Sequence, residues 1–200
     1  GDVDQNIERI QDVETHRPAN ERILYDANRG FTRQQALRVM QATEQWKVMF
    51  EQPCETLDDI AAIRPLHSAP VSVDECLVTL QDAARVARDG IAEVFGIKLN
   101  RVGGLTKASR IRDIALAHGI DIFVMATGGS VLADTEALHL AATIPDVNML
   151  GVWACQDMIT AEIADGAGPR ATKGHLHLPE QPGLGVHPQE STLTKVARYE

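Results

Sequence analysis

The sequence has 200 residues, of which 44% are hydrophobic and 24% are charged, and its net charge is −9. This composition predicts a globular protein with one sizeable core, and the negative charge argues against a nucleic-acid partner. No apolar run reaches the roughly 20 residues that a membrane-spanning helix needs, and three widely spaced cysteines favour a reducing, cytoplasmic location.

Helix and strand patterns follow one another in chain order. Apolar residues at helical spacing predict a first helix over residues 2–14. The apolar runs that follow predict strands over 23–28, 48–52, 71–74, 94–99, 120–125 and 147–153. The segments between them predict helices. Three of these begin after a capping threonine and two end at a glycine: Thr32, Thr56, Thr79, Gly90 and Gly119.

The C-terminal part of the chain has a weaker pattern. It predicts a short helix over 158–164, an alternating strand over 174–178 and a turn over 182–185. His175 and His177 share one face of that strand and could bind a metal. Without a third ligand nearby in the sequence, we interpret this face as solvated.

The alternation of strand and helix predicts an α/β fold with a parallel sheet. An open doubly wound sheet and a (β/α)₈ barrel of the TIM type both fit it. Open sheets of this kind often carry a dinucleotide-binding fingerprint, a GxGxxG motif after a strand. This sequence has no such motif. The catalytic groups of a barrel lie at the C-terminal ends of its strands, where this sequence carries charged residues, so the barrel is favoured.

Four consecutive predicted strands end on a charged residue. These residues are Asp26, Glu51, Asp74 and Lys98, at intervals of 25, 23 and 24 positions. A single acid at a strand end is most often a turn residue or a helix cap, and a lone lysine can simply reach solvent. Four such residues at one repeat interval are much harder to explain in that way, so we interpret them as one site.

Converging carboxylates repel one another unless a cation lies between them. Ligands that are all oxygen suit Mg²⁺, which keeps positions open for water or substrate. The metal would take both oxygens of a substrate carboxylate while Lys98 removes the α-proton, giving an enediolate. The pattern therefore predicts an Mg²⁺-dependent enzyme that acts on a small-molecule carboxylate.

Five short motifs carry a resemblance to a known family over nearly the whole chain. They are DANRG at 26–30, FEQP at 50–53, VDE at 73–75, KLNRVGG at 98–104 and PEQPGLG at 179–185. Together they resemble the enolase superfamily, in its muconate-lactonizing-enzyme and mandelate-racemase-like group.

The resemblance implies a role for each matching residue. Asp26, Glu51 and Asp74 would bind Mg²⁺, and Lys98 would be one acid/base catalyst. Glu75 would orient the ligands or pair with Lys98. The residues that would line or support the site are Asn28 and Arg101. The resemblance also implies a homo-oligomer.

The resemblance further implies that parts of the protein precede Gly1. Family members carry an N-terminal α+β capping domain, and a Lys-x-Lys motif on the second barrel strand supplies the opposite acid/base. We therefore expect residues 1–165 to be a partial barrel of about six of eight units, lacking its first strands. We expect residues 166–200 to return toward the capping domain, and the fragment alone to be inactive.

Three residues at or just after the ends of the last two predicted strands are candidates for binding the substrate or supporting the site. They are Met125, Thr127 and Trp153. The run EQPC at 51–54, the turn TGGS at 127–130 and Trp153 are similar to those of family members that act on proline derivatives, by dehydration of cis-3-hydroxy-L-proline or epimerisation of a hydroxyproline betaine. Trp153 could hold a cationic amine by a cation–π contact, or it could be a pocket wall or core residue. Met125 provides no acid for an ammonium group, which counts against an amino-acid substrate.

Other reactions and a non-enzyme remain as alternatives. Within the same superfamily these are racemisation or epimerisation of another amino acid and cycloisomerisation. The alternative hypothesis is that the chain is not an enzyme but an inactive barrel fragment or interaction module. This hypothesis predicts that the chain has no Mg²⁺ site.

Overall fold

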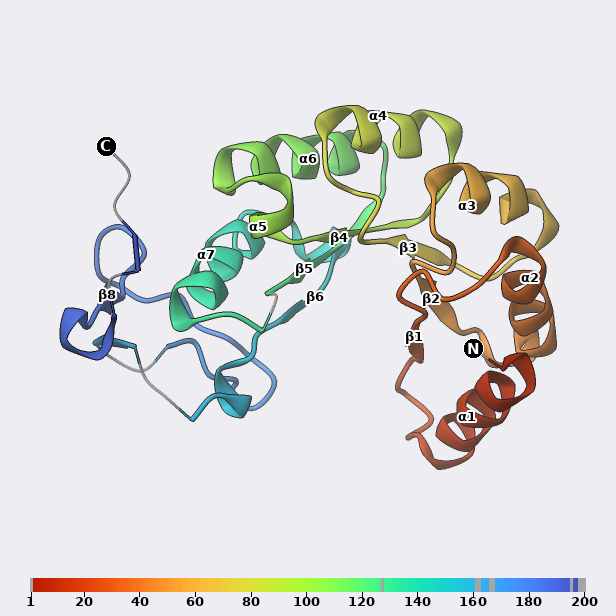
Figure 1. The fold of residues 1–200 in the computed structure, drawn as a ribbon, viewed down its shortest axis with the longest axis horizontal. Coiled ribbons are helices and arrows are strands. Elements are labelled where there is room, and N and C mark those ends of the chain that lie inside the picture. The colour runs from red at the N-terminus through yellow and green to blue at the C-terminus, as the bar shows by residue number, and fades with distance from the viewer. Residues whose placement is uncertain (1, 127, 161–162, 166–167, 195, 198–200) are drawn as a thin grey trace. The chain divides into compact units, whose positions relative to one another are not determined.

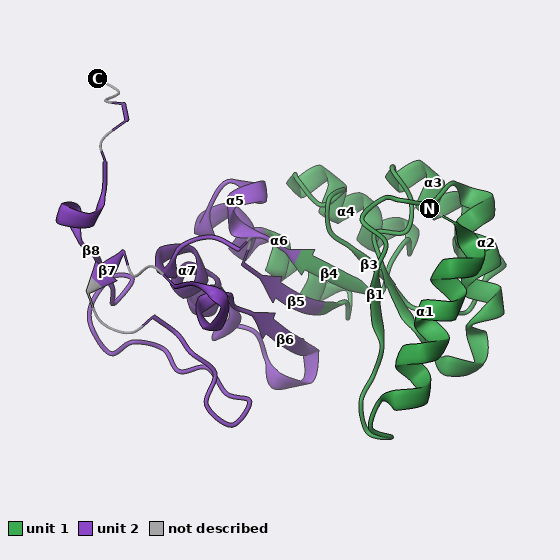
Figure 2. Cartoon of the chain, turned by 60° about the horizontal axis from the view of Figure 1, so that its bottom comes forward, with its two compact units in different colours: residues 1–96, 111–121 green, residues 97–110, 122–200 purple. Residues whose placement is uncertain are grey.

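The computed structural model describes residues 2–126, 128–160, 163–165, 168–194 and 196–197. The chain divides into two compact units, one of residues 1–96 and 111–121 and the other of residues 97–110 and 122–200 (Figure 2). The expected boundary at residue 165 stays a prediction.

The first unit is built on parallel strands that pair in chain order. These are β1 (Leu24–Asp26), β2 (Met49–Glu51), β3 (Val71–Val73) and β4 (Val94–Ile97). Every residue of β3 and β4 is buried, as is typical of parallel strands covered on both faces. Figure 1 shows α2, α3 and α4 lying along these strands.

The helices of the first unit lie before and between its strands, and all but the first connect successive strands, as the alternation predicted. They are α1 (Val3–His16), α2 (Arg33–Ala42), α3 (Leu57–Ile63) and α4 (Leu80–Asp89), with the 3-10 turns η1 (Glu44–Trp46) and η2 (Arg64–Leu66). α6 (Leu105–Ala117) is divided between the two units. The buried faces of α2, α3 and α4 supply small and branched apolar residues to the core: Ala36, Val39, Met40, Ile60, Ile63, Ala83 and Val86.

The second unit contains the parallel pair β5 (Asp121–Met125) and β6 (Met149–Trp153). Its helices are α5 (Leu99–Val102) and α7 (Val131–Ala141), with the 3-10 turns η3 (Asp146–Asn148), η4 (Gln156–Met158) and η5 (Glu190–Thr192). In the described residues, Asp134 of α7 is fully buried. Its Oδ2 accepts hydrogen bonds from the backbone N of Cys155 at 2.7 Å and from Nε2 of Gln156 at 2.8 Å. This carboxylate therefore fixes the chain just after β6.

The predicted helix starts are confirmed by their hydrogen bonds. The side chains of Thr32, Thr56 and Thr79 each accept a hydrogen bond from the backbone N three residues on. At Thr32 and Thr79 the side chain of that third residue also accepts from the threonine N, which completes a capping box. Gly90 ends α4 with a left-handed φ of 60°, as expected of a glycine at that position.

We expect Thr79→Ala to lower the free energy of unfolding by about 1 kcal/mol. Thr79 Oγ1 accepts from the N of Asp82 at 3.1 Å, and Asp82 Oδ2 accepts from the N of Thr79 at 2.8 Å, so the change leaves an N–H at the start of α4 without its acceptor. Urea unfolding of the full-length protein measures the loss. Thr106→Ala, at an exposed position of α6, is the control, and an equal effect of the two changes would contradict the capping role.

Three predicted elements of the C-terminal part can be compared with the structure, and two of them differ from it. The helix over 158–164 is wrong in its described residues, because Ala164–Asp165 is β7 and pairs antiparallel with β8 (His187–Pro188); residues 161 and 162 lie outside the described part. The strand over 174–178 is wrong as well. Thr172 and His175 exchange backbone hydrogen bonds across a tight turn in which Gly174 has a φ of 80°. The turn over 182–185 is confirmed.

No helix within the described ranges combines the length and the apolar composition needed to cross a lipid bilayer.

Candidate active site

The three predicted metal ligands lie at the C-terminal ends of successive strands in the first unit. Asp26 ends β1 and Glu51 ends β2, and the two are paired in the register of those strands. Asp74 follows the last residue of β3. Glu51 and Asp74 are only 3% and 1% exposed, whereas Asp26 is exposed. The structure therefore places two of the three carboxylates in the interior and the third at the surface.

Backbone hydrogen bonds continue between the chain segments beyond these strand ends. The N of Ala27 donates to the carbonyl of Glu51 at 3.0 Å, and the N of Gln52 donates to the carbonyl of Ser72 at 2.8 Å. The residues that carry the carboxylates are thus fixed by the same ladders that hold the strands together.

The turn after β1 is held in an uncommon backbone conformation. Asn28 and Arg29 have φ values of 45° and 62°, in the left-handed region that few non-glycine residues adopt. Asp26 Oδ1 accepts from the N of Asn28 at 2.9 Å, which is the local side-chain bond that lets such a turn form. Asn28 therefore supports the position of Asp26 through its backbone.

Arg29, for which the sequence predicted no role, connects this turn to the next two. Its N donates to the carbonyl of Gln52 at 2.8 Å, and its Nη1 donates to Oε1 of Glu55 at 3.2 Å. Its Nε lies 3.9 Å from Oε1 of Glu75. This contact is an ion pair of Glu75, and the expected role of Glu75 in orienting ligands or pairing with Lys98 stays a prediction. No sequence signal could have shown this contact, because it depends on the pairing of distant segments.

The cysteines that follow two of the candidate ligands are free thiols. Burial raises the pKa of Cys54 to about 11, and burial also raises the pKa of Cys76. Both thiols are therefore protonated near neutral pH, which does not favour a nucleophilic role. Their place in the structure agrees with a packing role.

Lys98 lies in the second unit, directly after β4. It occupies the N-cap position of α5, where its carbonyl accepts from the N of Arg101 at 3.1 Å and from the N of Val102 at 3.2 Å. Gly103 and Gly104, with φ values of 88° and 97°, then turn the chain into α6. The paired glycines of the KLNRVGG motif are thus required by the backbone, and the half-buried lysine is held on a defined turn.

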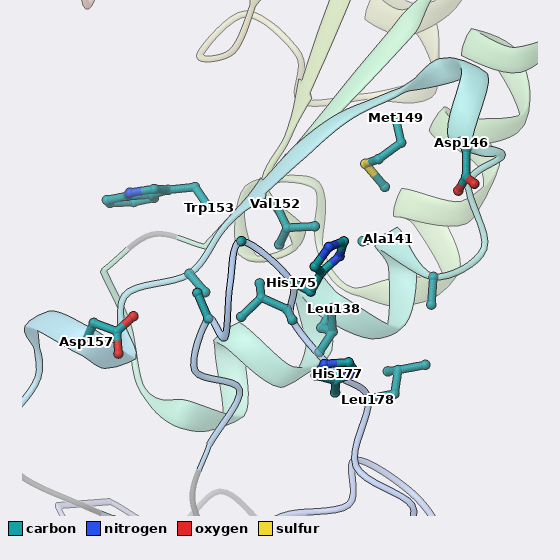
Figure 3. Close-up of a pocket in the computed structure, with 15 residues that line it drawn as sticks. Leu138, Ala141, Asp146, Met149, Val152, Trp153, Asp157, His175, His177 and Leu178 are labelled. Atoms are coloured by element: carbon teal, nitrogen blue, oxygen red, sulfur yellow. The ribbon is translucent and has the colours of Figure 1, made fainter. Parts of the chain in front are cut away.

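Met125 and Trp153 end β5 and β6 as register partners. Met125 is buried, and Trp153 is 42% exposed, so Trp153 is not a core residue. Thr127 lies outside the described residues. In the second unit Trp153 lines a cavity of about 550 Å³ beside α7, to which His175 and His177 also contribute (Figure 3). Both histidines are exposed, although the strand on which they were expected to share a face is not formed.

The donor set at the three strand ends has the chemistry of a magnesium site. It offers oxygen ligands only, and two of the carboxylates are buried, where a bound cation would offset the cost of their charge. Over the described residues, no three His, Cys, Asp or Glu side chains are gathered closely enough to hold a metal ion. The structure thus brings the backbones of these ligands together without a formed coordination sphere.

Comparison with known proteins gives a family match over most of the chain. A family model described as "Enolase C-terminal domain-like" matches residues 1–192. Among curated proteins, a cis-3-hydroxy-L-proline dehydratase from Roseibium aggregatum is 32% identical over 200 residues, which are 100% of this chain and 54% of the relative. An N-succinylamino acid racemase from Amycolatopsis sp is 30% identical over 201 residues, covering 95% and 53%. The chain therefore spans about half the length of the curated relatives it matches.

Solved structures agree with this match. A Silicibacter pomeroyi protein assigned to the mandelate racemase/muconate lactonizing enzymes is 77% identical with a TM-score of 0.94, over 98% of this chain and 55% of that one. A member of the enolase superfamily from Roseovarius nubinhibens ISM, in complex with magnesium, is 37% identical with a TM-score of 0.93, over 100% and 55%. The predicted fold class, the C-terminal portion of a (β/α) barrel of the TIM type, is confirmed.

Proposed function

The chain belongs to the Enolase C-terminal domain-like family, and from this premise we propose that the full-length protein is an Mg²⁺-dependent enzyme that removes the α-proton of a carboxylate substrate. The observation that carries the proposal is the placement of Asp26, Glu51 and Asp74 at the ends of three successive parallel strands. These three residues would hold the metal. Bound Mg²⁺ supplies positive charge to the substrate carboxylate and so favours loss of the neighbouring proton.

Lys98 moves the proton in this proposal. Its Nζ takes the α-proton from one face of the substrate or returns a proton to that face, as the family resemblance implies. The backbone hydrogen bonds at its N-cap position hold the residue on a fixed turn, which limits the directions that the side chain can take. The ion pair between Arg29 and Glu75 supports the turns that carry Asp26 and Asp74.

For the complete reaction we propose dehydration of a cis-3-hydroxy-L-proline-like substrate. After the α-proton has been removed, the β-hydroxyl leaves with a second proton as water, and a double bond forms between the α- and β-carbons. The support is the 32% identity with the Roseibium aggregatum dehydratase over the whole chain. A substrate without a β-hydroxyl can only be reprotonated or cyclised. Relatives named as a racemase, two epimerases and a cycloisomerase support these alternatives.

The remaining features of the proposal follow from the same resemblance. The substrate is a small carboxylate, and the protein is a homo-oligomer. The three free cysteines support a reducing, cytoplasmic location. Residues 1–200 are proposed to be inactive alone, since the capping domain and the opposite acid/base would lie in the remaining half of the protein.

Proton exchange in deuterated water tests the proposal. The full-length protein with Mg²⁺ is incubated with cis-3-hydroxy-L-proline, with a hydroxyproline betaine and with an N-succinylamino acid, and each is followed by NMR. We expect deuterium at the α-carbon or release of a dehydrated product for at least one of them, and loss of both on addition of a chelator. If all three carboxylates stay unlabelled and unconverted, the enzyme proposal fails and the interaction-module interpretation gains support.

A further inference from the structure

The side chain of Gln52 joins the turns that follow β2 and β3. It is fully buried, and its backbone has a φ of 38°, again in the left-handed region. Its Oε1 accepts from the N of Asp74 at 3.0 Å and from the N of Cys76 at 3.2 Å. Its Nε2 donates to the carbonyl of Cys54 at 3.0 Å and lies 2.9 Å from Sγ of Cys76. The amide thus uses both of its ends in the interior.

A neutral amide satisfies this set of partners, whereas an ionised carboxylate or an apolar side chain does not. The backbone N–H groups of Asp74 and Cys76 can only donate, so the atom that faces them must be an acceptor. The carbonyl of Cys54 can only accept, so the atom that faces it must carry a hydrogen. A carboxylate at this position would meet that carbonyl with an oxygen, and an apolar side chain would leave the two buried N–H groups without an acceptor.

The position of this amide bears directly on the two buried carboxylates. Gln52 is covalently next to Glu51, and its Oε1 binds the backbone N of Asp74 itself. Its backbone carbonyl also accepts from the N of Arg29, in the turn that follows Asp26. One residue therefore contacts the turn after each of the three strands that carry a proposed ligand.

We propose that Gln52 is a positioning residue that sets Asp74 relative to Glu51 for the binding of a divalent cation. This inference rests on the proposed function, because it needs those two carboxylates to be metal ligands. The amide acts through the backbone, since it touches the N–H of Asp74. Loss of the amide frees the backbone of residues 74–76, so the two carboxylates no longer hold one geometry before the metal arrives.

The test is the affinity of the full-length protein for Mg²⁺, measured by titration calorimetry and repeated with Mn²⁺. Gln52→Met leaves the side-chain volume about the same and adds no charge. It removes all four contacts of the amide group. We expect its dissociation constant for Mg²⁺ to rise about 10–100-fold, the usual range for groups that orient metal ligands. Gln52→Asn is a second variant, which keeps the amide but draws it back by one methylene, and we expect a smaller rise.

Two controls separate positioning from a general loss of stability. Gln34→Met changes an exposed glutamine of α2 in the same way, and Ile60→Val weakens the buried face of α3 away from the turns. We expect both to keep the wild-type affinity when it is measured well below their unfolding temperatures. Since affinity is measured on folded protein, a purely structural role of Gln52 would lower the unfolding temperature and leave the dissociation constant unchanged.

The outcomes distinguish the inference from the proposal beneath it. If the wild type binds Mg²⁺ and Gln52→Met binds it equally well, the positioning role is overturned and the proposed function stands. If Ile60→Val weakens binding as much as Gln52→Met, the effect is one of stability and the role is again overturned. If the wild type binds no Mg²⁺, the proposed function fails and the inference fails with it.

Discussion

Replacing Lys98 by alanine is expected to lower the rate of α-proton exchange by about 10²–10⁴-fold, the contribution usually found for a general acid or base. The α-proton of a carboxylate leaves only if a base lies within reach, and in the proposed reaction Lys98 Nζ is that base or returns the proton. NMR of the substrate in deuterated water, with the full-length protein and saturating Mg²⁺, measures the rate. The affinity for Mg²⁺ is expected to stay close to that of the wild type.

The control for this change is a lysine with no proposed part in the reaction. Lys107 is exposed on α6, where alanine is a good helix former, so Lys107→Ala is expected to leave the exchange rate unchanged. Lys98→Arg keeps the positive charge but cannot become a neutral base near pH 7, so it is expected to be as slow as the alanine variant. Wild-type exchange in Lys98→Ala would show that another group moves the proton.

The elements that the sequence predicted well are those decided by short-range chemistry. Thr32 and Thr79 form capping boxes with residues three positions away, so the whole interaction lies inside one window of sequence. The six long strands were found because each is an apolar run that alternates with a helical segment. The structure makes every one of them shorter than predicted, and the first runs only over Leu24–Asp26 instead of residues 23–28. Positions at the ends of these strands could therefore be assigned before the structure was known.

The C-terminal part was predicted poorly because its structure depends on distant partners. Ala164–Asp165 becomes a strand only by pairing with His187–Pro188, more than twenty residues later, and nothing local marks either segment. The alternating pattern over 174–178 misled the prediction because the local pattern is that of a strand, but no neighbouring strand pairs with it in the described residues. The described chain instead closes a turn between Thr172 and His175.

The same reason explains which site residues were missed. Asp26, Glu51 and Asp74 could be named because strand ends follow from local pattern. Gln52 and Arg29 act through contacts with turns that lie 22 to 46 positions away, and in the sequence each is one more polar residue in a turn. Pairing between strands decides which turns meet, so the residues that connect turns become visible only in three dimensions.

Replacing Asp74 by asparagine is expected to raise the dissociation constant for Mg²⁺ by more than about 100-fold, beyond the range for groups that only orient ligands. Asparagine has nearly the same shape as aspartate, so the change removes a negative charge with little change of volume. The carboxylate is 1% exposed and follows β3 directly, so solvent would screen its attraction to a bound metal only weakly. Titration calorimetry with the full-length protein measures the affinity.

Loss of the metal should also be visible in stability. A ligand that binds only the folded protein adds about 2.7 kcal/mol when its concentration is 100 times its dissociation constant. Wild type is therefore expected to unfold at a higher temperature in such a concentration of Mg²⁺ than in chelator, and Asp74→Asn is expected to lose this difference. Asp113→Asn, at an exposed position of α6, is the matched control and should keep it. An Mg²⁺-dependent shift in Asp74→Asn equal to that of wild type would show that Asp74 does not bind the metal. A residue other than Asp74 would then have to be the third metal ligand beside Asp26 and Glu51.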